Sequence, residues 1–342
     1  MRSRSIHVLL AACTALPLFA TPAFAQSDIL LRLRSGSPAG DRFRVDSASG
    51  FVAQGILGIG IIPASGSGER VMWHPYKAAF RAGSIGSGGT QWDDSNVGFY
   101  TWAGGYNTTA TGLASVAFGY QGSATGSYST AFGYLGNATG TGSIAMGYRS
   151  TADASYAVAI GQRASANGFT GAFVISDAST TDSTEASANN QFSGRMAGGW
   201  RLFTNATRTT GVTLNASGSS WNVVSDRNRK ENILELDGEF VLERLRDVPV
   251  TMWNYIDEGE HVRHIGPMSQ DWHRAFALND DSLTINQGDF DGINLAAIRA
   301  LEQRTAALRK AHEELAAKAK RIEELEARLE RIEALLAVPP PR

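Results

Sequence analysis

Two side chains in the second half of this 342-residue chain have the types and the spacing for serine-based peptide chemistry. Ser225 and Lys230 lie five positions apart in the segment Ser-Asp-Arg-Asn-Arg-Lys. A serine hydroxyl becomes a strong nucleophile when a base takes its proton, and a lysine is such a base only when desolvation or nearby positive charge lowers its pKa. Arg227 and Arg229 would add positive charge. Arg229 cannot replace Lys230 as the base, because a guanidinium does not lose its proton.

The same segment also fits a purely structural interpretation. Ser225 or Asp226 is suited to cap the N-terminus of a helix, with charged residues in the first turn. Taken alone, a serine five residues before a lysine favours the helix cap over catalysis.

A ladder of short motifs precedes this segment, and its copies begin at positions 103, 117, 131, 145 and 159, a constant step of 14. A fixed short period indicates one structural unit stacked on itself, and a step of this length suits a β-solenoid coil with two short strands. One such coil buries too little apolar surface to fold alone, so we expect several chains around a common axis. The five copies are Ala103-Gly-Gly-Tyr, Ala117-Phe-Gly-Tyr, Ala131-Phe-Gly-Tyr, Ala145-Met-Gly-Tyr and Ala159-Ile-Gly-Gln.

The composition changes abruptly after the next stretch of predicted strands and turns, which covers residues 177–224. From Asp226 onward charge is dense, and the sequence predicts a helix over 239–246, a strand over 250–255 and a helical turn over 272–278. One long helix is expected from Ile293 to Leu336. Its apolar residues recur every seven positions, which predicts a coiled-coil seam: Leu301, Leu308, Leu315, Ile322, Leu329 and Leu336.

The N-terminus has the features of an export signal. A basic start, an apolar run from Val8 to Phe19 and an Ala-Phe-Ala site before Gln26 predict a signal peptide over residues 1–25. Export by a Gram-negative-type bacterium to the periplasm, the cell surface or the medium would follow. As an alternative, Leu-Ala-Ala-Cys13 has the form of a bacterial lipobox, which would make Cys13 a lipidated N-terminus.

Composition excludes several other kinds of chemistry. Cys13 is the only cysteine, so the mature chain would have no disulfide, Cys metal site or Cys nucleophile. The net charge of −2 gives no indication of nucleic-acid binding. No later segment is apolar for long enough to span a membrane. His261, His264 and His273 lack the spacing of a metal site, and no cofactor is expected.

The repeat unit Ala-Thr-Gly-x-x-Ser-x-Ala-Φ-Gly-Tyr resembles the head repeat of YadA-like trimeric autotransporter adhesins over about residues 96–176. The resemblance implies a parallel β-roll with three chains to a head. Aromatic residues in the preceding region, 26–95, are interpreted as core and subunit-interface packing, with a sugar-binding platform as the alternative.

Residues 225 to about 303 resemble the intramolecular chaperone at the C-terminus of phage endosialidase tailspikes and tail fibres. The motifs that carry the resemblance follow Ser225 in order: Val248-Pro-Val, Trp253-Asn-Tyr, His264-Ile-Gly-Pro-Met-Ser-Gln-Asp and Asp291-Gly-Ile-Asn-Leu-Ala-Ala-Ile. The resemblance implies a domain that helps three chains assemble and then cuts the Val224–Ser225 bond with Ser225 and Lys230. It implies only packing and hydrogen bonding for His264, Gly266 and Gln270.

These patterns together predict a mainly β, homotrimeric tail-fibre or adhesin-like protein, with a small α+β chaperone domain and a trimeric coiled coil after the head. Its only enzymatic activity would be single-turnover self-cleavage. The alternative is a non-cleaving adhesin with a permanent C-terminal clamp. A glycan hydrolase is disfavoured, because it needs two facing carboxylates and the repeats contain only Asp153. The expected parts are residues 1–25, 26–95, 96–176, 177–224, 225–300 and 301–338.

Overall fold

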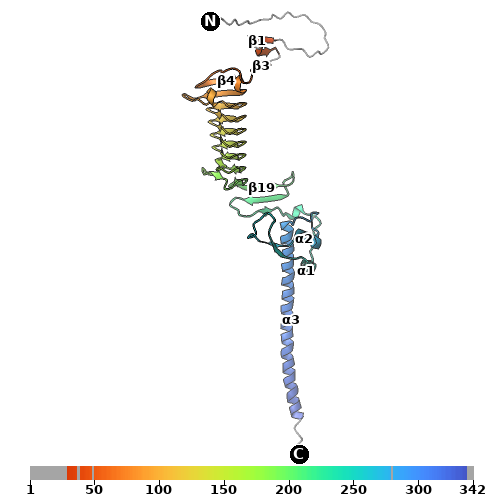
Figure 1. The fold of residues 1–342 in the computed structure, drawn as a ribbon. Helices are drawn as coiled ribbons and strands as arrows, with labels where there is room; N and C mark the ends of the chain where they lie inside the picture. The colour runs from red at the N-terminus through yellow and green to blue at the C-terminus, as the bar shows by residue number, and fades with distance from the viewer. Residues whose placement is uncertain (1–28, 37–38, 48–49, 279, 337–342) are drawn as a thin grey trace, which may run out of the picture. The chain divides into compact units, whose positions relative to one another are not determined.

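The computed structural model describes residues 29–36, 39–47, 50–278 and 280–336 (Figure 1). The predicted signal peptide and Cys13 lie outside these residues. The chain divides into two compact units: residues up to Arg201 together with Leu214–Trp221, and Leu202–Thr213 together with the residues from Asn222 onward. Among the residues described, no helix is both long and apolar enough to cross a membrane.

The first unit is dominated by a stack of parallel strands (Figure 1). Each strand pairs in register with the equivalent strand of the next copy, so that Ala131 lies opposite Ala145 and Tyr134 opposite Tyr148. This confirms the solenoid that the period predicted. The longer strands are β6 (Trp102–Tyr106), β8 (Val116–Tyr120), β10 (Thr130–Tyr134), β12 (Ile144–Tyr148), β14 (Val158–Gln162), β16 (Phe173–Ser176) and β18 (Phe192–Arg195).

Shorter strands form the second sheet of the solenoid, in the order β17-β15-β13-β11-β9-β7. They are β7 (Thr109–Ala110), β9 (Ser123–Ala124), β11 (Asn137–Ala138), β13 (Thr151–Ala152), β15 (Ala164–Ser165) and β17 (Thr184–Glu185). Before the repeats, β4 (Gly68–His74) pairs antiparallel with β5 (Ala79–Ile85), which pairs parallel with β6 and so extends the longer-strand sheet. The 3₁₀ helices η1 (Pro75–Lys77) and η2 (Asp94–Asn96) interrupt this part of the chain.

The interior of the solenoid is built from small side chains. Columns of fully buried alanines run through it, one of them Ala103, Ala117, Ala131, Ala145 and Ala159, beside a column of buried serines, Ser115, Ser129 and Ser143. An alanine contributes far less burial free energy than the roughly 1.5–3 kcal/mol typical of a buried leucine, so the stability gained inside each coil is small.

The large apolar side chains of the repeats lie on the outside instead. Phe118 stacks on Phe132 with ring centroids 5.5 Å apart, and the next position in that column is the exposed Met146. The tyrosines that end β6, β8, β10 and β12 form a second stack, with centroids 5.0–5.1 Å apart. Because the stacked tyrosine rings cover one another's faces, the tyrosine stack leaves little open aromatic face on which a sugar could pack.

Charged residues close the two ends of the solenoid. At the first end, buried Arg81 donates to the carbonyl and hydroxyl oxygens of Thr101, and burial lowers the pKa of Arg81 to about 10. At the other end, Asp177 accepts hydrogen bonds from Ala197 N–H and from Arg195. These bonds, chiefly the one from Ala197, hold the pKa of Asp177 well below its usual range.

Two glycines in one coil predict opposite mutational effects. Gly119 has a φ of +117°, and a Cβ there would lie 2.1 Å from the carbonyl oxygen of Gly133. Gly122 has an ordinary φ and its nearest neighbour would be 3.7 Å away. We expect Gly119→Ala to destabilise the solenoid by about 3 kcal/mol, since backbone strain and a clash with the next coil add together.

Gly122→Ser is the matched substitution and should stabilise the solenoid. Two coils later, Ser150 Oγ lies 3.1 Å from Met146 O and 3.0 Å from Gly161 O. A serine at 122 would meet the equivalent carbonyls, adding about 1 kcal/mol from one new hydrogen bond and a stiffer unfolded chain. Thermal unfolding of the full chain checks both changes, and equal midpoints for the two variants would contradict this account of the interior.

The remaining β-structure of the described residues includes two small antiparallel sheets. One sheet contains β1 (Ile29–Gly36), β2 (Ala39–Asp46) and β3 (Phe51–Ala53), and the other contains β19 (Gly199–Phe203), β20 (Gly211–Asn215) and β21 (Asn222–Val223). Strand β21 pairs with β20, with Val223 opposite Val212 and Asn222 opposite Thr213. The segment from Ser225 to Lys230 therefore follows closely after a sheet strand.

The second unit is small and mixed in secondary structure, as predicted. Its core consists of Val241, Val248, Trp272, Ile293 and Ala297, with neighbouring apolar residues packed against them. Its elements are η3 (Arg227–Arg229), α1 (Gly238–Arg246), β22 (Thr251–Trp253), β23 (His264–Gly266), α2 (Ser269–Phe276) and α3 (Gln287–Leu336).

Two predicted helix boundaries in this unit need correction. Helix α2 begins at Ser269 and ends at Phe276, because Ala277 adopts a left-handed conformation that stops it. Helix α3 begins at Gln287, before the predicted Ile293. Asn286 supplies the reason: its side-chain oxygen accepts from Gly288 N–H at 2.8 Å, which is the geometry of an N-cap.

Candidate active site

The two predicted chemical side chains are in direct contact. Lys230 Nζ donates a hydrogen bond to Ser225 Oγ across 2.6 Å. Val224 N–H donates to the carbonyl oxygen of Gly211 at 3.3 Å, so the peptide bond between Val224 and Ser225 leaves the β20–β21 pairing and enters the turn that holds the pair. The candidate nucleophile, its candidate base and the bond expected to be cut therefore lie in one short segment.

A single helical turn brings Lys230 back to Ser225. Asp226 caps this turn, η3, by accepting from Asn228 N–H at 3.0 Å. Lys230 then ends the turn, with its own N–H donating to Arg227 O at 3.2 Å. The cap is therefore Asp226, and Ser225 is left to contact Lys230, so the helix-cap interpretation does not exclude the catalytic one.

Charge and solvent surround the pair. Arg229 Nε lies 3.4 Å from Asp226 Oδ2, and both side chains are about half exposed. Ser225 and Lys230 are also exposed in the single chain. The contact itself therefore forms without any partner chain, and one chain alone leaves the pair exposed to solvent.

A second polar cluster lies on the β22–β23 hairpin. His264 Nε2 is 2.9 Å from Glu258 Oε2, and its ring centroid is 4.7 Å from that of Trp253. The pKa of Glu258 is lowered, first by the hydrogen bond from Tyr255 N–H and then by His264. His264 thus packs and hydrogen bonds, as expected, while its partner Glu258 gave no signal in the sequence.

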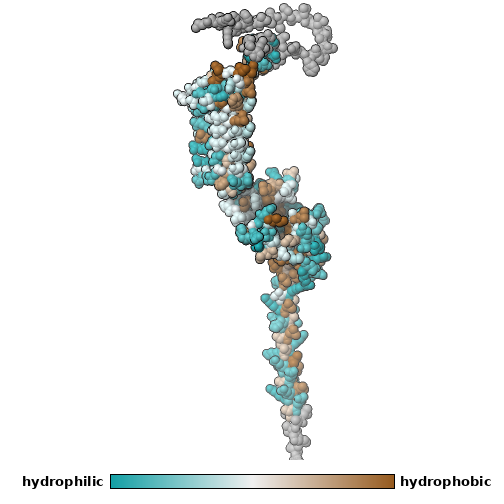
Figure 2. Space-filling view, in the orientation of Figure 1, coloured by the Kyte–Doolittle hydropathy of each residue, from teal (hydrophilic) through white to brown (hydrophobic). Residues whose placement is uncertain are grey.

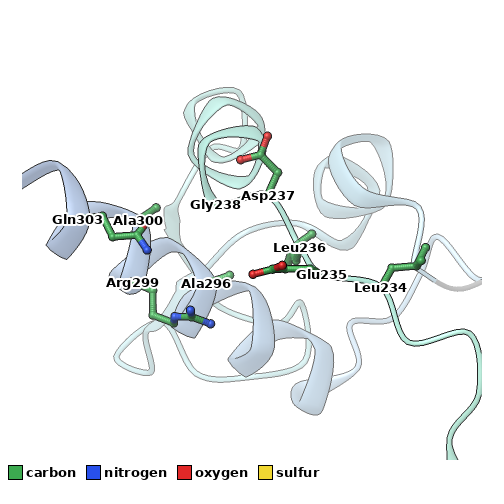
Figure 3. A pocket seen from close by; sticks show the side chains of 9 residues that line it. All are labelled: Leu234, Glu235, Leu236, Asp237, Gly238, Ala296, Arg299, Ala300 and Gln303. Carbon is green, nitrogen blue, oxygen red and sulfur yellow. The ribbon is translucent and has the colours of Figure 1, made fainter.

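A groove of about 630 Å³ lies elsewhere in the second unit (Figure 3). Figure 3 shows the segment from Leu234 to Gly238 along one side, with Ala296, Arg299, Ala300 and Gln303 of α3 on the other. Neither Ser225 nor Lys230 lines this groove. This groove is therefore separate from the contact between Ser225 and Lys230.

Comparison with known families separates the two parts of the chain. Residues 225–279 match the family model described as chaperone of endosialidase, of the peptidase S74 family. Residues 103–121, 110–135 and 138–164 match the YadA head domain repeat. No curated protein and no solved structure shows significant similarity to the chain. Both predicted resemblances are confirmed, and the first match begins at Ser225, the candidate nucleophile.

Proposed function

We propose that this protein is an exported, trimeric tail-fibre or adhesin-like protein whose C-terminal chaperone drives assembly and then cuts itself off between Val224 and Ser225. The observation that carries the proposal is the 2.6 Å contact between Ser225 and Lys230 at the first residue of the match to the endosialidase chaperone. The YadA-type repeats support a surface-exposed head, consistent with the signal peptide expected from the sequence.

Exposed apolar surface supports a trimer. Along α3, the heptad residues Leu301, Leu308, Leu315, Ile322 and Leu329 are 52–71% exposed in the single chain. Figure 2 shows hydrophobic residues running down this helix among hydrophilic ones. A stripe of this period is covered when helices supercoil together. Proteins with either of the two matched domains are typically trimeric, and in the head the outward column of Phe118, Phe132 and Met146 gives three chains a second apolar surface to share.

The proposed reaction needs only residues of this segment. Ser225 Oγ attacks the carbonyl carbon of Val224 while Lys230, as the neutral amine, takes the Oγ proton. The bond from that carbon to the Ser225 nitrogen breaks, the nitrogen receives the proton, and an ester joins Val224 to Ser225 Oγ. Water hydrolyses the ester, leaving a carboxylate on Val224 and a free hydroxyl on Ser225, which is the new N-terminus.

Assembly would supply the missing condition for this reaction. In the single chain the lysine amine faces solvent. Covering the segment with neighbouring chains would disfavour a charge on that amine, because desolvation acts against the ionised form. Cleavage would then follow correct assembly.

The solvent exposure of the pair also supports the second candidate function, in which the C-terminal unit stays attached as a permanent trimer clamp. The contact between Lys230 and Ser225 would then be a structural hydrogen bond.

Intact mass spectrometry of the purified protein distinguishes the two candidates. The proposal expects two species: a head ending at Val224 and a fragment beginning at Ser225. Sedimentation of the same sample should give the mass of three heads. One undivided chain would support the clamp, and a cut at another bond would contradict the assignment of Ser225. A stable monomer would contradict both candidates.

A further inference from the structure

We propose that Asp226 is the positioning residue for the reaction, because its carboxylate fixes the turn that holds Lys230 against Ser225. The inference rests on the proposed function for its consequence, but its structural content can be tested without cleavage.

The need for such a residue follows from chain geometry. Residues five apart in an extended strand are separated by about 16 Å, since each residue advances about 3.3 Å. A lysine side chain extends for only about 6 Å from its Cα, as its few single bonds allow. The 2.6 Å contact between Lys230 and Ser225 therefore requires the intervening backbone to fold back, and η3 provides that fold.

The turn has few hydrogen bonds of its own. Two backbone bonds define it, from Arg229 N–H to Asp226 O at 3.1 Å and from Lys230 N–H to Arg227 O at 3.2 Å. Helix formation is cooperative and its first turn is unfavourable, so an isolated turn depends strongly on its cap.

Both carboxylate oxygens of Asp226 hold this turn. Oδ1 accepts from the backbone N–H of Asn228 at 3.0 Å and from its side-chain amide at 3.2 Å. Oδ2 lies 3.4 Å from Arg229 Nε. One side chain thus connects the start, the middle and the end of η3, directly between the nucleophile and the base.

The same unit contains a matched control. Asp237 caps α1 in the same way, with its side chain accepting from Glu239 N–H at 2.9 Å. Asp237→Ala removes an equivalent cap without touching the turn from Ser225 to Lys230. Serine at position 226 would retain the capping hydrogen bond, because serine is among the preferred N-cap residues.

The first measurement is the rate at which the fragment beginning at Ser225 appears when the full-length chain is synthesised. We expect Asp226→Ala to lower the rate about five- to tenfold, the loss that one N-cap corresponds to. Asp226→Ser should restore it to within about twofold, by retaining the cap. Asp237→Ala should lower the thermal stability of the unit and leave the rate unchanged. A wild-type rate for Asp226→Ala, a Ser variant as slow as the Ala variant, or equal slowing by Asp237→Ala would each overturn the inference.

The second measurement uses hydrogen exchange of residues 227–230 in the Ser225→Ala background, where no cleavage is expected. Asp226→Ala should increase exchange in this segment, and Asp226→Ser should restore protection. Unchanged exchange would overturn the positioning role. If the wild-type chain proves uncut while these exchange results hold, the proposed function fails but the role of Asp226 in the turn stands.

Discussion

Ser225→Ala is expected to leave the whole chain in one piece on a denaturing gel, where the wild type yields two. The substitution removes the only atom that could attack the Val224 carbonyl in the proposed reaction, and the 2.6 Å contact to Lys230 disappears with it. The expected loss is complete on the timescale of expression, because an unassisted peptide bond does not hydrolyse in hours.

Two further variants separate chemistry from folding. Lys230→Arg keeps a positive charge and a long side chain but provides a guanidinium that cannot accept the serine proton, so it too should remain uncut. Ser220→Ala changes an exposed serine five residues earlier and should be cut like the wild type. Two fragments from Ser225→Ala would exclude Ser225 as the nucleophile, whatever the other variants show.

The repeats were predictable because their signal is both local and redundant. An alanine, a glycine and an aromatic residue recur at fixed places in successive repeats. All three take equivalent positions in every coil only if the coils stack in register. The structure shows Gly119, Gly133 and Gly147 where one coil approaches the next too closely for a side chain. Because several copies carry the same pattern, one copy that departs from it does not obscure the period, and the period is enough to predict the solenoid.

The chemical segment could be predicted only in part. The sequence predicted Ser225 and Lys230 as a candidate pair, and the structure places them in contact. The sequence left open whether Ser225 or Asp226 acts as the cap, since both residue types suit that position. Which of the two residues caps the turn depends on the geometry of η3 and on the ion pair between Arg229 and Asp226, and no periodic sequence pattern encodes either. The partnership of Glu258 with His264 was unpredictable for the same reason: it depends on how one hairpin folds.

Removal of the C-terminal unit is expected to have a large effect on how well the head refolds, and the fold explains why. Each coil buries mainly alanine and serine, so a single chain gains little by closing its solenoid. The larger apolar side chains face outward, and in the proposed trimer they would become buried only when neighbouring chains are in register. Bringing three chains into one register has an entropic cost that must be met before those contacts form.

We therefore expect the cleaved, purified head to recover poorly after denaturation in guanidinium, whereas uncut Ser225→Ala protein recovers several-fold more trimer. In the uncut chain, the exposed heptad stripe of α3 can associate first and hold three heads at high local concentration, so that registration becomes an intramolecular step. The yield of trimer after dilution, measured by sedimentation at several protein concentrations, checks this. Recovery of the uncut protein should depend less on concentration once its helices have associated.

Equal recovery of the two proteins would mean that the head contains its own assembly information, and the C-terminal unit would then need another role. Poor recovery of the cut head alone implies that the native head persists because its unfolding is slow and not readily reversed, so that cleavage makes assembly effectively irreversible.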